Sequence, residues 1–240
     1  MQPNSSTSDA APPCPKCKGI GYFNRYVEVG EPGFGEIFPC PWCKPQAAMP
    51  RLQKIARLSE SELARRFEDI VTEGRPGTAR MLAACRQFLE QPQHILTIHG
   101  EVGNGKTLAA LALVNALNAA RIEALYMRIF DLLEYLKQGF DASSESRSDN
   151  SRGRLQRVVN VRVLVLDDFD RRSETPWANE QVEHLIDTRH RLAEDGTAGT
   201  VIIMNGDPAL QPRRIASRLL DGRNRVVHNG DSDIRSALRA

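Results

Sequence analysis

The sequence predicts an α/β domain, with a five-stranded parallel sheet between two helical layers, preceded by a small metal-binding module. Five short apolar segments alternate with helical patterns, and strands that are apolar throughout belong in a sheet covered on both faces. A glycine-rich motif follows the first of these strands, and two pairs of cysteines lie near the N-terminus. With 240 residues, 41% of them hydrophobic, the chain is long enough for one such domain and an appendage.

Composition and charge exclude some classes of protein. No apolar stretch approaches the ~20 residues of a membrane span, and residues 1–12 form a polar tail without the pattern of a signal peptide. We therefore expect a cytoplasmic protein without a membrane partner. The net charge of +2 argues neither for nor against nucleic acid.

The four cysteines near the N-terminus form two C-P-x-C pairs, Cys14 with Cys17 and Cys40 with Cys43. In a reducing cytosol such pairs indicate a metal, and four thiolates at this spacing make a tetrahedral site, most simply for Zn²⁺. Mononuclear iron, or cysteines that stay free or form disulfides, are the alternatives. We expect a zinc-binding module over residues 13–46. Its aromatic residues either form a miniature core or stack on single-stranded DNA: Tyr22, Phe23, Tyr26, Phe34 and Phe38.

A linker over residues 47–58 and two helices should precede the first strand. Ser59 and Glu62 form a capping box, which starts the first helix. That helix should carry three apolar side chains on one face: Leu63, Phe67 and Ile70. The second helix, over residues 78–89, should bury another row: Met81, Leu82, Cys85 and Leu89.

The stretch from Gly100 to Thr107 reads G-x-x-x-x-G-K-T and joins a strand over residues 95–99 to a helical pattern. In this context the backbone N–H groups of the loop surround phosphate oxygens at a helix N-terminus. Lys106 should reach the β- and γ-phosphates of ATP, and the Thr107 hydroxyl should ligate Mg²⁺. The residues expected to bind the nucleotide are Gly100, Glu101, Val102, Gly103, Asn104, Gly105, Lys106, Thr107 and Leu108.

The remaining elements alternate in the same way. Further strands are expected over residues 124–129, 163–166, 200–204 and 225–228. Asp131 should cap a short helix, and two further helices are expected over residues 176–193 and 211–220. The stretch 141–153 is rich in serine and charge, which predicts a mobile loop.

Polar side chains end two of these strands. Asp167 and Asp168 follow the strand over residues 163–166, where a carboxylate can hold, through water, the Mg²⁺ that Thr107 ligates. We assign this role to Asp167 and expect Asp168 to orient and deprotonate the attacking water. Asn205 ends the next apolar strand, where its amide can position the water or simply form a turn.

Arg218 shares a helix face with Arg214, four residues earlier. Its guanidinium can stabilise charge at the γ-phosphate of a neighbouring subunit, or the helix can simply be a solvated basic one.

In this order, the phosphate loop, the Leu-Asp-Asp strand end, Asn205 and the Arg-x-x-Ser-Arg-Leu-Leu helix resemble the AAA+ ATPases. The DnaC/IstB branch, which comprises helicase loaders and the ATPases of certain transposons, is the most similar part of that class. The resemblance covers about residues 58–230, which we divide into the end of the linker and an AAA+ domain over residues 59–230, and it implies a sheet of order 5-1-4-3-2. It also implies that Asn205 acts as a sensor and that Arg218 acts in trans as an arginine finger.

The chain departs from this pattern in three places. Many AAA+ proteins have Glu at the position of Asp168, which is one methylene shorter, and this change favours slow hydrolysis that a partner stimulates. Phe169-Asp170 stands where this branch usually has Leu-Gly. Residues 231–240 are expected to be a tail, so no C-terminal lid domain is predicted.

The resemblance implies an ATPase that loads a hexameric replicative helicase onto single-stranded DNA and self-associates under ATP control. The alternative is an IstB-like ATPase that assists a transposase. A small-molecule P-loop kinase, a RecA-like repair ATPase and a switch that binds ATP without needing hydrolysis are the other readings. The cofactors expected are ATP, Mg²⁺ and Zn²⁺.

Overall fold

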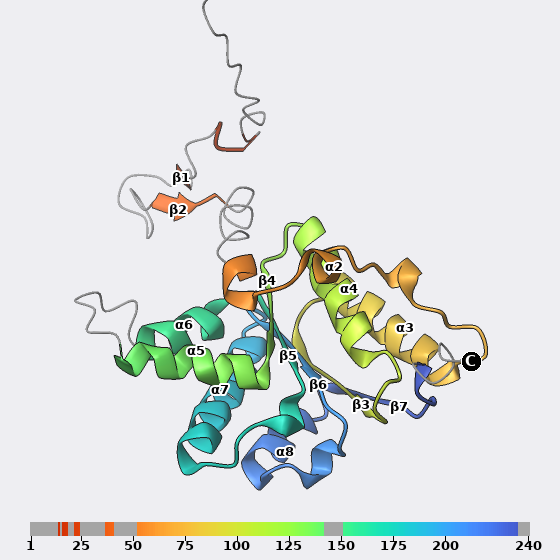
Figure 1. The fold of residues 1–240 in the computed structure, drawn as a ribbon. Coiled ribbons are helices and arrows are strands. Elements are labelled where there is room, and N and C mark those ends of the chain that lie inside the picture. Colours follow the sequence, from red (N-terminus) through yellow and green to blue (C-terminus); the bar gives the residue numbers. More distant parts are fainter. Residues whose placement is uncertain are drawn as a thin grey trace, which may run out of the picture.

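The main sheet has the predicted order. The computed structural model describes residues 14, 16–18, 22–24, 37–40, 52–141 and 151–234. Five parallel strands lie in the order β4-β5-β6-β3-β7 (Figure 1). When these five strands are numbered 1 to 5 along the chain and read from the other edge, this is the predicted order 5-1-4-3-2. Their bounds are β3 His94–Gly100, β4 Ala124–Arg128, β5 Val163–Asp167, β6 Gly199–Ile203 and β7 Arg225–Asn229. The α/β class and the five strands are thereby confirmed.

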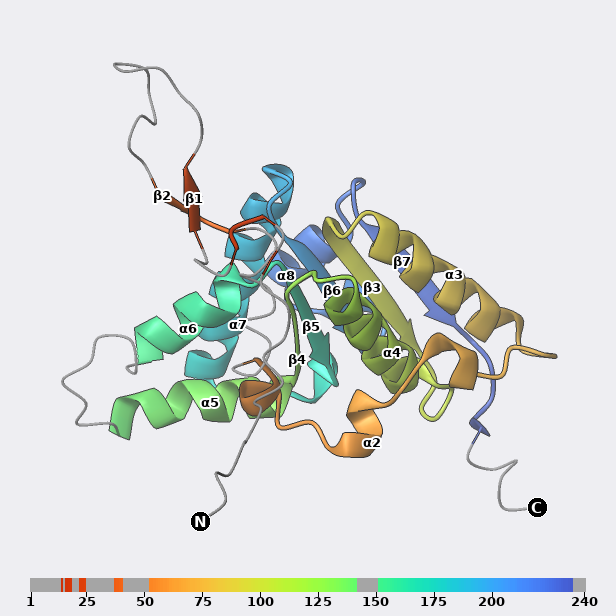
Figure 2. The same cartoon turned by 90° about the horizontal axis from the view of Figure 1, so that it is seen from above.

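Helices cover both faces of this sheet, as Figure 2 shows from above. One layer consists of α3 Pro76–Glu90 and α4 Lys106–Ala119. The other consists of α5 Ile129–Asp141, α6 Ser151–Asn160, α7 Pro176–Glu194 and α8 Arg213–Leu219. Neighbouring side chains of β5 alternate between the layers, because Val165 packs with α4 whereas Leu164 and Leu166 pack with α5 and α7.

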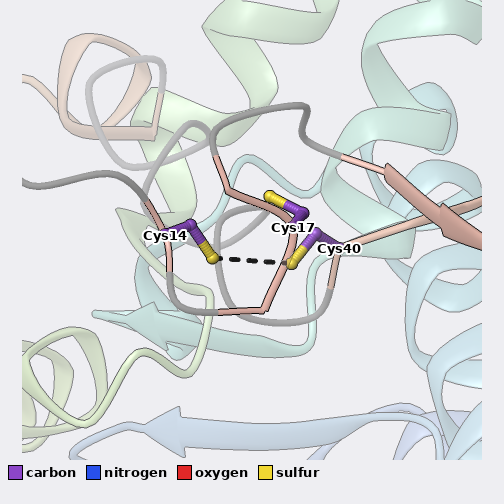
Figure 3. Close-up of side chains that lie close together, drawn as sticks. All are labelled: Cys14, Cys17 and Cys40. Carbon is purple, nitrogen blue, oxygen red and sulfur yellow. Dashed lines mark hydrogen bonds between the residues drawn. The ribbon is translucent and has the colours of Figure 1, made fainter.

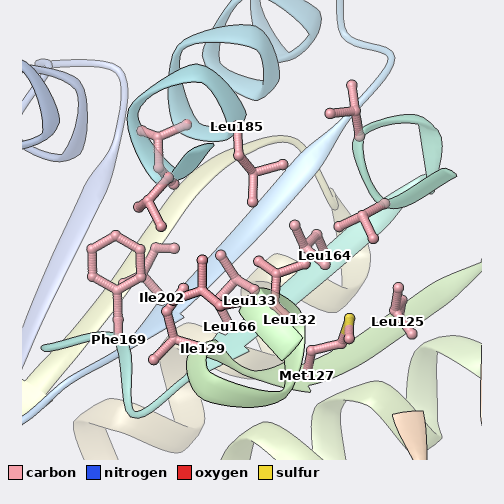
Figure 4. Packing of buried hydrophobic residues seen from close by; sticks show 14 of the residues in the cluster. Leu125, Met127, Ile129, Leu132, Leu133, Leu164, Leu166, Phe169, Leu185 and Ile202 are labelled. Atoms are coloured by element: carbon pink, nitrogen blue, oxygen red, sulfur yellow. The ribbon is translucent and has the colours of Figure 1, made fainter. Parts of the chain in front are cut away.

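The core beneath α5 and α7 is continuous up to the end of β5. Leu166 and Phe169 are fully buried there with Ile129 and Leu185 (Figure 4). Burying each such side chain stabilises the fold by about 1.5–3 kcal/mol. The strand ends that carry the polar side chains are therefore attached to a rigid support.

Two local predictions are wrong: the length of the first helix and the N-cap of the helix after β4. Ser59 and Glu62 do form the capping box, but α2 Glu60–Leu63 is a single turn. Arg66 then takes an extended conformation and Asp69 accepts its N–H, which starts a separate 3-10 turn, η1 Phe67–Asp69. In the other case α5 begins at Ile129, so Asp131 lies within its first turn and does not cap it. An acidic side chain there still suits the helix dipole.

The predicted loop over residues 141–153 is partly helical. Asp141 ends α5, and Ser151 begins α6, a helix that the sequence pattern did not predict. Residues 142–150 lie outside the described residues. Val158 and Val159 are the buried anchors of α6. The other residues of this helix are mostly polar or basic, which is why its apolar periodicity was too weak to detect.

Near the N-terminus, β1 Tyr22–Asn24 and β2 Ile37–Pro39 pair as an antiparallel ribbon. Residues 52–56, within the expected linker, are helical, and Leu52 is buried in the core beside α5 and α6. None of the described helices is long and apolar enough to cross a membrane.

Candidate nucleotide-binding site

The loop between β3 and α4 has the backbone that a phosphate-binding loop needs. Gly105 has a φ of 94°, in the left-handed region that favours glycine, and it directly precedes the first residue of α4. Gly100 has a φ of 139°, and a Cβ there would lie 2.0 Å from the carbonyl oxygen of Asn229. Both positions therefore require glycine. The N-terminus of α4 and its free N–H groups face the same space as the loop.

Lys106 is held inside this loop. Its Nζ donates to the carbonyl oxygens of Gly100 (2.8 Å) and Glu101 (2.6 Å) and to Oδ1 of Asn104 (3.2 Å). Only 6% of its surface is exposed, and this burial lowers the pKa of Lys106 below its ordinary value, against the opposing effect of Asp167 and other nearby carboxylates. The loop thus presents a buried cation beside the free N–H groups of a helix.

Asp167, the last residue of β5, lies next to Thr107 at the start of α4. Asp167 is 2% exposed, and burial raises the pKa of its carboxyl group, while hydrogen bonds from Tyr126 and Thr107 act in the opposite direction. Tyr126 donates its hydroxyl to Oδ2 of Asp167 at 2.6 Å. A buried carboxylate beside a threonine hydroxyl is a donor set that suits Mg²⁺.

Tyr126 was not predicted as part of the site. The sequence does place a tyrosine within the apolar strand over residues 124–129. A buried tyrosine hydroxyl usually has a hydrogen-bond partner, so this residue could have indicated a polar group nearby.

Asp168 and Asn205 lie at neighbouring strand ends and share a cavity with Lys106. Asp168 has a φ of 52°, an uncommon conformation for a residue with a side chain and one that is often found at functional sites. The cavity has a volume of about 390 Å³ and is lined by Val102, Gly103, Asn104, Gly105, Lys106, Thr107, Leu108, Asp167, Asp168, Arg171, Ile203, Met204, Asn205 and Ile234. Gly100 and Glu101 contribute the carbonyls that hold Lys106.

Arg218 is placed elsewhere. It lies on α8, where its Nη2 contacts Oδ1 of Asp187 on α7 at 2.7 Å, and its side chain is 43% exposed. Among the described residues that line the cavity, Arg171 contributes a guanidinium and Arg218 does not. The structure therefore brings Lys106, Asp167 and Asn205 together and leaves Arg218 outside the site of its own chain.

The segment after β7 was expected to be a tail, but its described part and Asn229, the last residue of β7, contact the phosphate loop. Asn229 is fully buried and donates to the carbonyl oxygen of Asn104, whose own Nδ2 donates back to the carbonyl of Asn229. Ile234 donates its N–H to the carbonyl oxygen of Gly103 at 3.0 Å. Residues 229–234 thus support one side of the cavity. No local sequence pattern indicates a contact between such distant segments.

Asp231 caps α3 from this segment. Its carboxylate accepts the N–H groups of Gly77 (3.0 Å) and Thr78 (2.6 Å), in the first turn of the helix, where Arg75 at the N-cap has no accepting side chain. Burial would raise the pKa of Asp231, but the hydrogen bonds from Thr78 and Gly77 lower it overall.

We expect Asp231→Ala to reduce the free energy of unfolding by about 1 kcal/mol, the usual value of a helix cap. A depressed pKa means that this stabilisation is present above the unfolded-state pKa, near 4, and is lost as the pH falls through the folded-state value. Thermal melts at pH 7 should therefore separate the variant from the native protein, and this difference should shrink as the pH falls below 4. Asp195→Ala, at an exposed aspartate, is the control. A difference that persists unchanged at pH 3 would contradict the cap.

The described cysteines of the N-terminal module converge. The sulfur atoms of Cys14, Cys17 and Cys40 all lie within 4.8 Å of one another, and those of Cys14 and Cys40 are 3.8 Å apart (Figure 3). A tetrahedral Zn–S distance of about 2.3 Å places two sulfurs roughly 3.8 Å apart, whereas a disulfide requires about 2.05 Å. The three thiols therefore fit a zinc site. Cys43 lies outside the described residues.

The fold, the phosphate loop and the strand-end carboxylate define an ATPase of the AAA+ class, with ATP and Mg²⁺ as its ligands. A family model described as IstB-like ATP binding protein matches residues 45–231. The chain belongs to this family. No curated protein matches the chain.

Solved structures with similar folds include those of DnaC, DnaI and DnaA. The crystal structure of the DnaC helicase loader aligns with a TM-score of 0.56 and 22% identity, over 71% of this chain and 99% of that one. The structure of DnaI aligns with a TM-score of 0.56 and 17% identity, over 76% and 98%. AMPPCP-bound DnaA from Aquifex aeolicus aligns with a TM-score of 0.58 and 18% identity, over 71% and 52%. The chain spans about half the length of the first replication-initiation structures that it matches.

Proposed function

We propose that the protein uses ATP binding and slow hydrolysis to control the loading of a hexameric replicative helicase onto single-stranded DNA. The observation that carries this proposal is the placement of Arg218. It is half-exposed on α8 and does not line the cavity of its own chain, which suits a role at the cavity of a neighbouring subunit. A site shared between subunits makes assembly depend on the nucleotide, as a loader requires.

Each residue of the proposed site has a part in ATP binding or hydrolysis. Lys106 and the N–H groups of the loop bind the phosphates, and Thr107 with Asp167 would hold Mg²⁺, which neutralises charge on the β- and γ-phosphates. Asp168 orients the attacking water and accepts its proton, and Asn205 fixes the position of that water. Arg218 of the neighbouring subunit stabilises the charge that develops on the γ-phosphate.

The similarity of fold to the structure of the DnaC helicase loader, over 71% of this chain, also supports a loader. A direct test combines the protein with a purified hexameric helicase of its host and circular single-stranded DNA. We expect helicase to remain on the DNA only when both the protein and ATP are present. Helicase retention that is independent of the protein or of ATP would overturn the proposal.

A role beside a transposase is the second candidate, and the match to the IstB-like family favours it. Affinity capture of the tagged protein from its native host, followed by mass spectrometry, separates the two candidates. Recovery of a replicative helicase supports the loader. Recovery of a transposase without helicase supports the transposition ATPase.

We also propose that Cys14, Cys17, Cys40 and Cys43 hold one structural Zn²⁺ and that the module around it contacts the helicase or DNA. The convergence of three thiols, two of them buried, supports this assignment. A site filled by four protein ligands leaves no open position for a substrate, so its role would be structural.

The purified protein should contain about one zinc per chain, and Cys14→Ser should lose most of it, because three remaining thiolates bind zinc weakly. Elemental analysis measures the zinc and would also reveal iron. Cys85→Ala is the matched control. Cys85 is buried in the core, and this burial raises the pKa of its thiol to about 12, so it should not ligate zinc. Full zinc content in the Cys14→Ser protein would show that the metal lies elsewhere.

A further inference from the structure

Asp170 links the ends of two neighbouring strands. It lies in the 3-10 turn η2 Phe169–Arg171, directly after the aspartate pair that ends β5. Its Oδ2 accepts the backbone N–H of Asn205 at 3.1 Å and that of Gly206 at 3.0 Å, and both residues belong to the turn that follows β6. One carboxylate oxygen therefore receives both donors of this turn.

The residue types at the start of this turn do not by themselves define its conformation. Asn205 and Gly206 are residue types that adopt many backbone conformations, including left-handed ones. Hydrogen bonds to a carboxylate are about twice as strong as neutral ones, so two of them can select one conformation. The buried Phe169 attaches the turn that carries Asp170 to the core.

By fixing the turn, Asp170 also fixes the position of the Asn205 side chain. Asn205 lines the cavity together with Lys106 and Asp168, whereas Asp170 is not among the described residues that line it. Asp170 can therefore influence chemistry in the cavity by fixing where the backbone of Asn205 lies. A displacement of about 1 Å of a group that positions a reactant can cost on the order of 100-fold in rate.

We propose that Asp170 is a positioning residue for ATP hydrolysis, which holds the Asn205 amide at the γ-phosphate through the two N–H groups of its turn. This inference rests on the proposed hydrolysis at this site. It does not depend on whether the partner is a helicase or a transposase.

The first test compares single-turnover hydrolysis of ATP, at protein in excess, with the Kd for ATP. Asp170→Ala should reduce the hydrolysis rate about 10- to 100-fold and change the Kd less than about threefold. An unchanged Kd excludes a loss of folding as the cause, and Asp170→Asn, which keeps an acceptor oxygen, should recover most of the rate. Asp207→Ala is the control in the same turn, because its side chain caps Ala209 and not Asn205. An Asp170→Ala protein that hydrolyses ATP at the native rate overturns the proposal.

The second test is a double-mutant cycle. Asn205→Ala should reduce hydrolysis about 100-fold, and adding Asp170→Ala should then reduce it less than about twofold further, because the side chain that Asp170 positions is already gone. Equal effects of Asp170→Ala in both backgrounds would show that it acts independently of Asn205 and would overturn the inference. If the native protein itself does not hydrolyse ATP, with DNA and partners present, the proposed hydrolysis and this inference both fail.

Discussion

Lys106→Ala is expected to weaken ATP binding by about 100-fold or more and to abolish hydrolysis. Lys106 is the only lysine among the described residues that line the cavity, and its side chain is buried at the N-terminus of α4. A charge-assisted hydrogen bond is worth about 1.5–3 kcal/mol, and Lys106 should make such bonds to two phosphates. Each 1.4 kcal/mol corresponds to a tenfold change in Kd, which gives the expected loss. Titration with a fluorescent ATP analogue measures it directly.

Two controls separate this effect from a damaged loop. The alanine variant leaves the carbonyls of Gly100 and Glu101 without the donor that they share, so thermal melts must show that the domain still folds. Lys137→Ala removes a lysine that is half-exposed and paired with Glu134 on α5, and it should bind ATP normally. A folded Lys106→Ala protein with the native affinity for ATP would contradict the assignment of this cavity.

The strands were predictable because each is a short apolar run, and two of them end in polar residues. The runs over residues 163–166 and 200–204 stand out in this way, and their polar ends are the side chains that meet in the cavity. The periodicity of the sequence does not predict the order of the strands, because a buried strand has the same apolar pattern at any position in a parallel sheet. The order came from the resemblance to AAA+ ATPases, and the structure confirms it.

The features that could not be predicted are contacts made by single side chains over long distances in sequence. Asp231 caps a helix that begins 155 positions earlier, at Pro76, and Asp170 reaches a turn 35 residues later. Such contacts produce no periodic pattern in the sequence. They require only one carboxylate and backbone N–H groups, which every residue except proline has. The helix α6 was missed for a different reason, since only a few apolar residues support it within a basic segment.

The second large effect is expected at Arg218. Arg218→Ala should reduce hydrolysis by about 1,000-fold, the usual contribution of an arginine finger, and should change the Kd for ATP by less than about threefold. The side chain is half-exposed on α8 and paired with Asp187, and it does not line the cavity that holds Lys106. Its removal therefore leaves the binding site of its own chain intact. Single-turnover hydrolysis and equilibrium titration together separate the two quantities.

Mixing two inactive proteins tests whether the arginine acts in trans. The Arg218→Ala protein keeps its cavity, and the Lys106→Ala protein keeps its arginine, so mixed assemblies should contain some complete sites and recover part of the activity. Arg214→Ala is the control on the same helix, since that side chain is 86% exposed and contacts Glu183 at 3.6 Å. If the mixture stays inactive, or if Arg218→Ala loses ATP binding, Arg218 acts within its own chain. In that case the site is not shared between subunits, and the loader proposal loses its main support.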